Sequence, residues 1–145
     1  MLAHISQILQ RKGSKVWCIA PDATVYDALT MMAEKGVGAL VVEKEGRVVG
    51  MFGERDFVLK VGLCGLSART TTVGQVMSED IYCVTPGTSI NEAMAIVTES
   101  HHRHLPVIDN EQLVGLVSIG DLVKASLDEK DFVIKQLTKY IKGEL

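Results

Sequence analysis

The sequence has few of the features that mark disulfide-rich, membrane-spanning or nucleic-acid-binding proteins. Its three cysteines, Cys18, Cys64 and Cys83, are odd in number and far apart, and no C-x-x-C occurs. Neither a disulfide framework nor a structural zinc site is therefore predicted. No apolar run approaches the roughly 20 residues that a membrane-spanning helix needs. A net charge of −3 does not predict the basic surface of a nucleic-acid-binding protein.

The composition instead indicates one water-soluble domain with a substantial core. A chain of 145 residues has about the length of a single domain, and 47% of its residues are hydrophobic. The first residues, MLAHISQILQRKG (1–13), alternate apolar and polar side chains and lack the continuous apolar core of a signal peptide. We therefore expect a cytoplasmic protein.

The chain repeats itself. Positions 18–58 align without a gap with positions 83–123, so that CIAPDATVYDALTMMAEKGVGALVV in the first copy matches CVTPGTSINEAMAIVTESHHRHLPV in the second. The identical pairs include cysteine, proline, glycine and aspartate positions: Cys18 with Cys83, Pro21 with Pro86, Gly50 with Gly115 and Asp56 with Asp121. An internal repeat of this length predicts two similar supersecondary units that pack on each other.

Each copy has the pattern of a β-α-β-β-α unit. Both long helices are predicted to begin with a capping box, formed by Thr24 with Asp27 and by Ser89 with Glu92, and apolar residues follow at helical spacing. The five elements are expected at 16–19, 24–36, 39–42, 47–52 and 57–61, and again at 81–84, 89–101, 105–108, 113–118 and 122–127. The fold class is therefore α/β (α+β), with two repeats packed as a pseudo-twofold pair.

Three further segments frame the repeats. ISQIL (5–9) and VGQVM (73–77) resemble each other, and each is predicted to form a helical turn leading into a copy. The expected divisions are a lead-in at 1–15, the first repeat at 16–62, a linker at 63–72, the second repeat with its lead-in helix at 73–127, and an amphipathic C-terminal helix at 128–145. That last helix, with Val133, Leu137, Tyr140 and Ile141 on one face, either covers the core or forms a dimer contact.

The strand-to-helix motifs GMFGERD (50–56) and GLVSIGD (115–121), the proline after each first strand and the LPV entry to a middle strand carry a family likeness. Together with the repeat they resemble a tandem CBS-domain pair, or Bateman module, of the small stand-alone bacterial type. The resemblance implies a non-catalytic sensor that binds AMP, ADP, ATP, S-adenosylmethionine or NAD-type ligands between its two copies. It also implies pairing of chains into disc-shaped dimers.

Asp121 and Asp56 are the candidate ribose ligands, because one carboxylate can accept a hydrogen bond from each of two vicinal hydroxyls. Ser118, three residues before Asp121, adds a hydroxyl for the ribose or a phosphate. Both Asp121 and Ser118 also suit a helix start, where they act as caps. The first copy has Gly53 at the serine position, a departure from the family pattern that weakens the prediction for Asp56.

The phosphate ligands predicted from the family pattern are Arg103 and His104, with Arg55 directed toward the same cleft. Arginine can bind phosphate oxygens bidentately, and a partly protonated histidine adds positive charge that depends on pH. The first copy has Gly38 and Ala39 where the second has Arg103 and His104. We therefore expect one anion site with several cationic residues, and a second site that is weaker or used differently.

The adenine ring is expected in a slot whose side chains are mostly apolar, although the same side chains also suit a core. The predicted residues are Tyr82, Val84, Thr85, Val107 and Ile119, with Ile19 as the first-copy counterpart.

No metal site or catalytic centre is predicted. His102 and His104, if they share a strand face, supply two ligands where zinc needs three or four, and His101 suits a helix end. No activated nucleophile or phosphate-cradling loop occurs that would make a nucleotide hydrolase. The leading hypothesis is a regulatory protein with an adenosine nucleotide as its ligand, AMP before ADP, ATP or NAD(H). It would form a homodimer and act on an unknown protein, with neither nucleic acid nor membrane as partner. The alternative is a constitutive dimerisation or interaction scaffold.

Overall fold

A computed structural model describes residues 2–127 and Thr138. The C-terminal helix predicted at 128–145, with its proposed dimer contact, therefore lies outside the described residues except for Thr138. Within residues 2–127, no helix is both long enough and apolar enough to cross a membrane.

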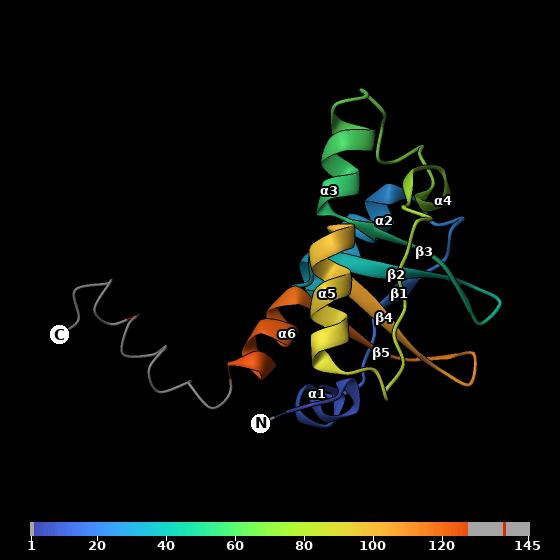
Figure 1. The fold of residues 1–145 in the computed structure, drawn as a ribbon. Helices are drawn as coiled ribbons and strands as arrows, with labels where there is room; N and C mark the ends of the chain where they lie inside the picture. Colours follow the sequence, from blue (N-terminus) through green and yellow to red (C-terminus); the bar gives the residue numbers. More distant parts are fainter. Residues whose placement is uncertain (1, 128–137, 139–145) are drawn as a thin grey trace.

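The first repeat forms a three-stranded sheet with its helices beside it (Figure 1). Its elements are β1 (Cys18–Ile19), α2 (Val25–Lys35), β2 (Ala39–Lys44), β3 (Arg47–Gly53), α3 (Glu54–Asp56) and the π-helix η1 (Phe57–Gly62). β1 pairs with β2 in parallel, and β2 pairs with β3 antiparallel. The closing helix, expected at 57–61, thus starts earlier and continues as a π-helix.

The second repeat has the same order but a reduced first strand. It consists of α5 (Ile90–Ser100), β4 (His104–Asp109), β5 (Gln112–Ser118) and α6 (Ile119–Ser126). The prediction of a strand at 81–84 is wrong, because only Val84 pairs, in a single parallel bridge to Val107. In the first repeat the Val41 amide donates to the Trp17 carbonyl, at 3.2 Å. Pro106 holds the Val41 position and has no N–H to donate, so the ladder stops.

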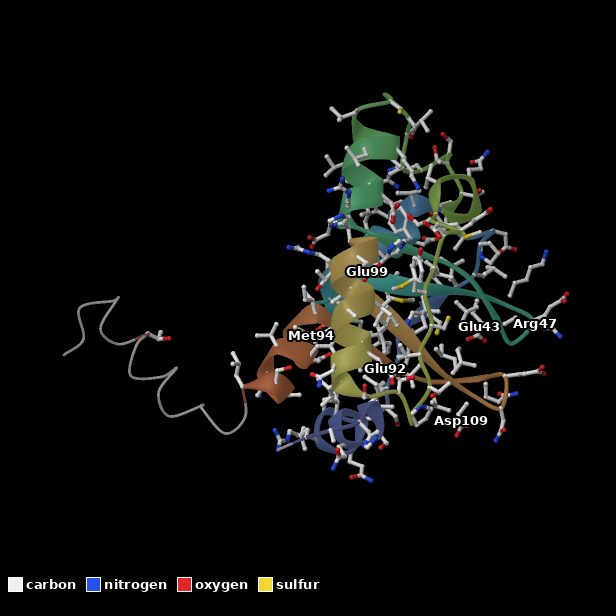
Figure 2. All side chains as sticks on the ribbon, in the orientation of Figure 1. Glu43, Arg47, Glu92, Met94, Glu99 and Asp109 are labelled. Carbon is white, nitrogen blue, oxygen red and sulfur yellow. The ribbon has the colours of Figure 1, made fainter. Side chains whose placement is uncertain are left out.

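The helix boundaries follow from local capping, as the sequence indicates. The Thr24 Oγ1 accepts the Asp27 amide at 3.1 Å, and the Ser89 Oγ accepts the Glu92 amide at 3.0 Å. Both long helices end at a left-handed residue, Gly36 with φ 66° and His101 with φ 61°. Figure 2 shows the side chains on this framework, with charged residues such as Arg47 toward the outer ends of the strand hairpins.

The lead-in helices do not cover their own repeats. Helix α1 (Ile5–Lys12) packs Ile5 and Ile8 into the core of the second repeat, while α4 (Val73–Val76) contributes to the core of the first. Figure 1 shows α1 beside the lower ends of α5 and β5, and α4 close to α2 and β3. The two helical turns predicted at 5–9 and 73–77 are thus present, but each packs on the repeat that does not follow it in the sequence. Each lead-in helix therefore packs on the other repeat, and this packing places the end of α1 beside α6.

Candidate functional site

Asp121 lies in the first turn of α6, where β5 ends. Its Oδ2 accepts the Ser118 amide at 2.8 Å, and the Ser118 Oγ accepts the Asp121 amide at 3.1 Å. This is the reciprocal capping box that the sequence allows as the structural role of both residues. Capping uses one carboxylate oxygen, and the side chain keeps 24% of its surface exposed.

Lys12, at the end of α1, is a member of this site that the sequence pattern does not reveal. Its Nζ lies 2.7 Å from the Asp121 Oδ2 and donates to the Leu116 carbonyl at 3.0 Å. Within residues 2–127 the hydrogen bonds of the carboxylate all use Oδ2, and Oδ1 accepts none from these residues. An ammonium has three N–H groups, so one donor of Lys12 remains as well. Only the exchanged packing of α1 brings this residue to the site.

His104 and Arg103 lie at the start of α6, because His104 pairs with Ser118 across the β4–β5 ladder. His104 opens β4 and is half-buried; burial and the charge of Lys12 lower its pKa below the ordinary value. Arg103 acts in the same direction, while the carboxylates of Asp121 and Glu54 oppose the shift. Arg103 itself is exposed, and its carbonyl accepts the Ile119 amide at 2.9 Å. Asp121 and Arg103 thus both act on the imidazole of His104.

A small cavity adjoins Asp121. Its volume is about 130 Å³, and its lining consists of three cations, the carboxylate and apolar side chains: Arg11, Lys12, Lys124, Asp121, Leu2, Ile8 and Ala125. The positive residues come from α1 and α6, so the positive charge of the lining is supplied by helices from both repeats' flanks.

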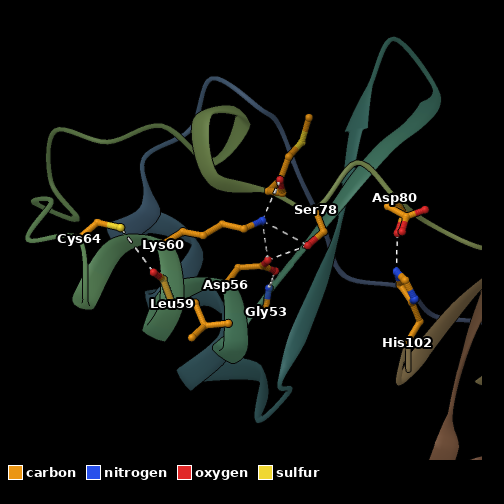
Figure 3. A network of polar contacts seen from close by, with 9 residues as sticks. Gly53, Asp56, Leu59, Lys60, Cys64, Ser78, Asp80 and His102 are labelled. Atoms are coloured by element: carbon orange, nitrogen blue, oxygen red, sulfur yellow. Dashed lines mark hydrogen bonds and ion pairs between the residues drawn. The ribbon is translucent and has the colours of Figure 1, made fainter. Parts of the chain in front are cut away.

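Asp56 lies at the matching place in the first repeat, but its carboxylate is engaged on both oxygens (Figure 3). The Ser78 hydroxyl donates to Oδ1 at 2.7 Å and the Lys60 Nζ lies 3.1 Å from the same atom. The Gly53 amide donates to Oδ2 at 2.9 Å. Ser78 thereby supplies a hydroxyl that Gly53 cannot, and only 14% of the Asp56 side chain is exposed.

A larger hollow of about 460 Å³ lies at this end of the molecule. It is lined mostly by α4 and the segment that follows it: Gly74, Gln75, Met77, Ser78, Glu79 and Asp80, with Lys60 and His102. Arg55, the third predicted phosphate ligand, is an exposed residue of α3. It does not line either hollow.

Half of the predicted adenine residues are core residues. Val84, Val107 and Ile19 are buried in the two cores, so their side chains leave no surface for a ring. Tyr82, Thr85 and Ile119 are exposed. Tyr82 lies edge-on to His102, with ring centroids 4.9 Å apart. The three exposed residues are those that remain available for a base.

The histidines do not gather into a metal site. His102 lies in the loop before β4, so it does not share a strand face with His104, which opens that strand. Its Nδ1 lies 3.0 Å from the Ser100 carbonyl oxygen, and its Nε2 contacts the Asp80 carbonyl oxygen (Figure 3). Within the described part of the chain, no three metal-binding side chains cluster.

Lys12 is expected to set the acid stability of the protein through Asp121. Burial opposes ionisation of Asp121, but the Lys12 and Ser118 contacts outweigh it and lower the pKa. A carboxylate with a lowered pKa stabilises the fold above its unfolded pKa, and the contribution is lost as pH falls through the folded pKa. Lys12→Met should therefore move acid unfolding to higher pH. The measurement is the free energy of unfolding by urea between pH 7 and 3.

Lys44→Met removes an equal charge from an exposed position in the β2–β3 hairpin and serves as the control. Identical pH profiles for the two variants would contradict the role of Lys12.

Comparison with known proteins gives the family. The CBS domain family matches residues 5–62 and 73–128. The CBS domain-containing mitochondrial protein CBSX3 of Arabidopsis thaliana is 40% identical over 96% of this chain and 72% of its own length. A Burkholderia ambifaria structure assigned to signal transduction is 41% identical, with a TM-score of 0.83 over 86% of this chain and 94% of that one. A hexameric CBS-CP12 protein from bloom-forming cyanobacteria has a TM-score of 0.76 at 28% identity, over 90% of this chain and 75% of that one.

The Burkholderia ambifaria structure is described as a signal-transduction protein with CBS domains, and the CBS-CP12 protein is described as a hexamer. The cytoplasmic location, the homodimer and the adenosine ligand stay predictions. Both the matched residues and the pseudo-twofold pair of units lead to one assignment: the chain belongs to the CBS-domain family and carries two CBS domains in tandem.

Proposed function

We propose that this protein is a non-catalytic regulatory module that binds an adenosine nucleotide at the Asp121 end of the molecule. The observation that supports the proposal most directly is the partly exposed carboxylate of Asp121, whose Oδ2 lies 2.7 Å from the Lys12 Nζ and whose charge acts on the nearby His104. A nucleotide needs such a combination, because its ribose donates hydrogen bonds while its phosphates accept them.

In this proposal the Asp121 Oδ1 accepts hydrogen bonds from the ribose hydroxyls. The remaining N–H of Lys12 and the guanidinium of Arg103 bind phosphate oxygens. His104 is neutral at pH 7 because its pKa is lowered, and a phosphate beside it would favour protonation. AMP is the preferred ligand, and ADP, ATP and NAD(H) are the alternatives.

Signalling follows from the position of Lys12. Its helix, α1, precedes the first repeat, packs on the second and ends at the proposed ligand carboxylate. A ligand that shares Asp121 and Lys12 therefore changes how α1 is anchored, and it favours whichever arrangement binds it more tightly. The responding partner is an unidentified protein, and we propose a homodimer as the acting species. Exposed apolar side chains on and after η1, such as Val58 and Leu63, support that assembly.

Titration calorimetry with AMP, ATP and NADH tests the proposal. We expect at least one of them to bind. Asp121→Asn should lower the affinity for that nucleotide by about tenfold or more, because a charged acceptor of hydrogen bonds is lost. Asp109→Asn, at the exposed end of β4, is the matched control and should leave the affinity unchanged. Sedimentation of the same samples reports the assembly. No binding of any of the three nucleotides by folded protein would refute the proposal.

One observation favours the alternative of a constitutive scaffold. The carboxylate of Asp56 is satisfied within the fold on both oxygens, which is expected of a site that holds no ligand. A scaffold predicts the same melting temperature with and without nucleotide. A sensor predicts a rise, since a ligand at about 100 times its Kd stabilises the fold by about 2.7 kcal/mol.

A further inference from the structure

We propose that His102 is a proton-dependent clamp on the segment that runs from α4 to the second repeat, residues 79–83. When both ring nitrogens of His102 carry protons, the ring holds this segment against the end of α5. Loss of one proton weakens the hold and frees the segment. The clamp operates whether or not a nucleotide binds.

The clamped segment connects the two repeats and forms neither helix nor strand. At its start, Ser78 exchanges two backbone hydrogen bonds with Met51 of the first repeat, at 2.8 and 2.9 Å. At its end, the Val84 amide donates to the Pro106 carbonyl of the second repeat at 2.9 Å. A contact in the middle of residues 79–83 therefore acts on the connection between the repeats.

His102 makes contacts of this kind. Its Nε2 contacts the carbonyl oxygen of Asp80 (Figure 3), and its ring lies edge-on to that of Tyr82, at an interplanar angle of 67°. Its Nδ1 lies 3.0 Å from the carbonyl oxygen of Ser100, the last residue of α5. The His102 amide also donates to the Ser100 Oγ at 3.2 Å, so the loop that carries the ring is itself held to α5.

The two ring contacts fit a charged imidazole and do not fit a neutral one. A carbonyl oxygen accepts hydrogen bonds and cannot donate them, and a neutral imidazole has one N–H and one acceptor nitrogen. Both contacts of His102 can therefore be hydrogen bonds only in the imidazolium form, in which both nitrogens donate. After loss of a proton, a nitrogen lone pair faces one of the two carbonyl oxygens, and that contact is no longer attractive.

The other charged groups around the ring act in both directions. Carboxylates favour the imidazolium; two of them line the same hollow as the ring and one lies in the last turn of α5, namely Glu79, Asp80 and Glu99. Cationic groups oppose it; one lines the hollow and two are exposed neighbours in the chain, namely Lys60, His101 and Arg103. Because both signs are present, the two carbonyl oxygens that touch the ring determine which form the fold favours.

The first repeat contains a permanently charged version of this arrangement. Trp17 holds the position in the first repeat that Tyr82 holds in the second. The ammonium groups of Lys15 and Lys35 each lie 4.4 Å from the centroid of the Trp17 ring. Lysine keeps its charge across the physiological pH range, whereas histidine does not. The contact of a cation with this aromatic side chain is thus made dependent on pH only in the second repeat, through His102.

Nuclear magnetic resonance of the isotope-labelled full chain tests the clamp in the wild type. Both ring nitrogens of His102 should carry protons at pH 5.5, and only one should at pH 8. The backbone amides of residues 79–83 should relax as a rigid segment at pH 5.5 and as a mobile one at pH 8, a change that the ring charge alone would not cause. A ring that keeps one charge state over this range, or one that titrates while the segment stays equally rigid, would overturn the inference.

Urea unfolding gives a second measurement, which reports the sign of the effect. Hydrogen bonds of the charged ring stabilise the fold in acid, and this contribution is lost as the ring loses its proton at higher pH. The ratio of the folding constants of wild type and His102→Gln should therefore be about fivefold larger at pH 5.5 than at pH 8. His101→Asn, at the exposed left-handed end of α5, is the matched control, and its ratio should change by less than about twofold. A His102→Gln ratio that is the same at both pH values, or larger at pH 8, would contradict the clamp.

Discussion

Replacing Ile5 by alanine is expected to lower the free energy of unfolding by about 2–5 kcal/mol. Ile5 precedes the first repeat in the sequence, yet it is fully buried in the core of the second. The cost combines the lost burial of its side chain with the cavity left between α1 and the second repeat. Urea unfolding monitored by circular dichroism measures the change.

The location of the effect is as informative as its size. Hydrogen exchange in Ile5→Ala should show faster exchange in β4 and β5 than in β2 and β3, because α1 covers only the second repeat. Leu63→Ala, at a side chain that is 76% exposed, is the control and should change stability by less than about 0.5 kcal/mol. Greater loss of protection in the first repeat would contradict the exchange of lead-in helices.

Gly50→Ala is expected to cost about 1–3 kcal/mol by overpacking. A Cβ on Gly50 would lie 2.7 Å from the Ser78 carbonyl oxygen and 2.8 Å from the Met77 Sδ. The nearer of these atoms belongs to the backbone, and the Ser78 amide and carbonyl both pair with Met51 in β3. The segment after α4 therefore cannot move away without losing hydrogen bonds. Thermal and urea unfolding measure the loss.

Alanine substitutions at two other glycines serve as comparisons for Gly50→Ala. A Cβ on Gly115 would lie 2.7 Å from the Leu9 Cδ2. Because the end of a flexible side chain can move, Gly115→Ala should lower the free energy of unfolding less than Gly50→Ala does. Gly87→Ala has as its nearest neighbour the Thr85 Oγ1, at 3.9 Å, and should be close to neutral. Equal stability of the Gly50 and Gly87 variants would show that the close approach is not a constraint.

The sequence predicts the fold well where the determining interactions are local. The long helices begin at the capping box of Thr24 and at the N-cap of Ser89, where the reciprocal bond predicted for Glu92 is absent from the described residues, and they end at the left-handed residues Gly36 and His101. The repeat then requires both units to share one architecture. Because a helix cap and an apolar stripe depend only on neighbouring residues, the order of the amino acids is enough to recognise them.

The sequence does not predict what depends on tertiary partners. Apolar periodicity shows that α1 has a face to bury, but it does not show which repeat that face meets, so Lys12 could not be assigned to Asp121. The first strand of the second repeat is reduced to a single bridge because Pro106 has no N–H, and this matters only once Val84 is known to pair there. Val84 and Val107 are buried, so they belong to the core. Their apolar character alone does not distinguish core residues from residues that line a ligand site.

The reciprocal placement of α1 and α4 means that sequence repeats and folded bodies have different boundaries. A protease that nicks the chain within 63–72 would separate the repeats in the sequence, but each fragment would still hold a helix belonging to the core of the other. The fragments would therefore remain associated as a complementing pair, and any gene-level division of this protein at the linker yields two interdependent halves.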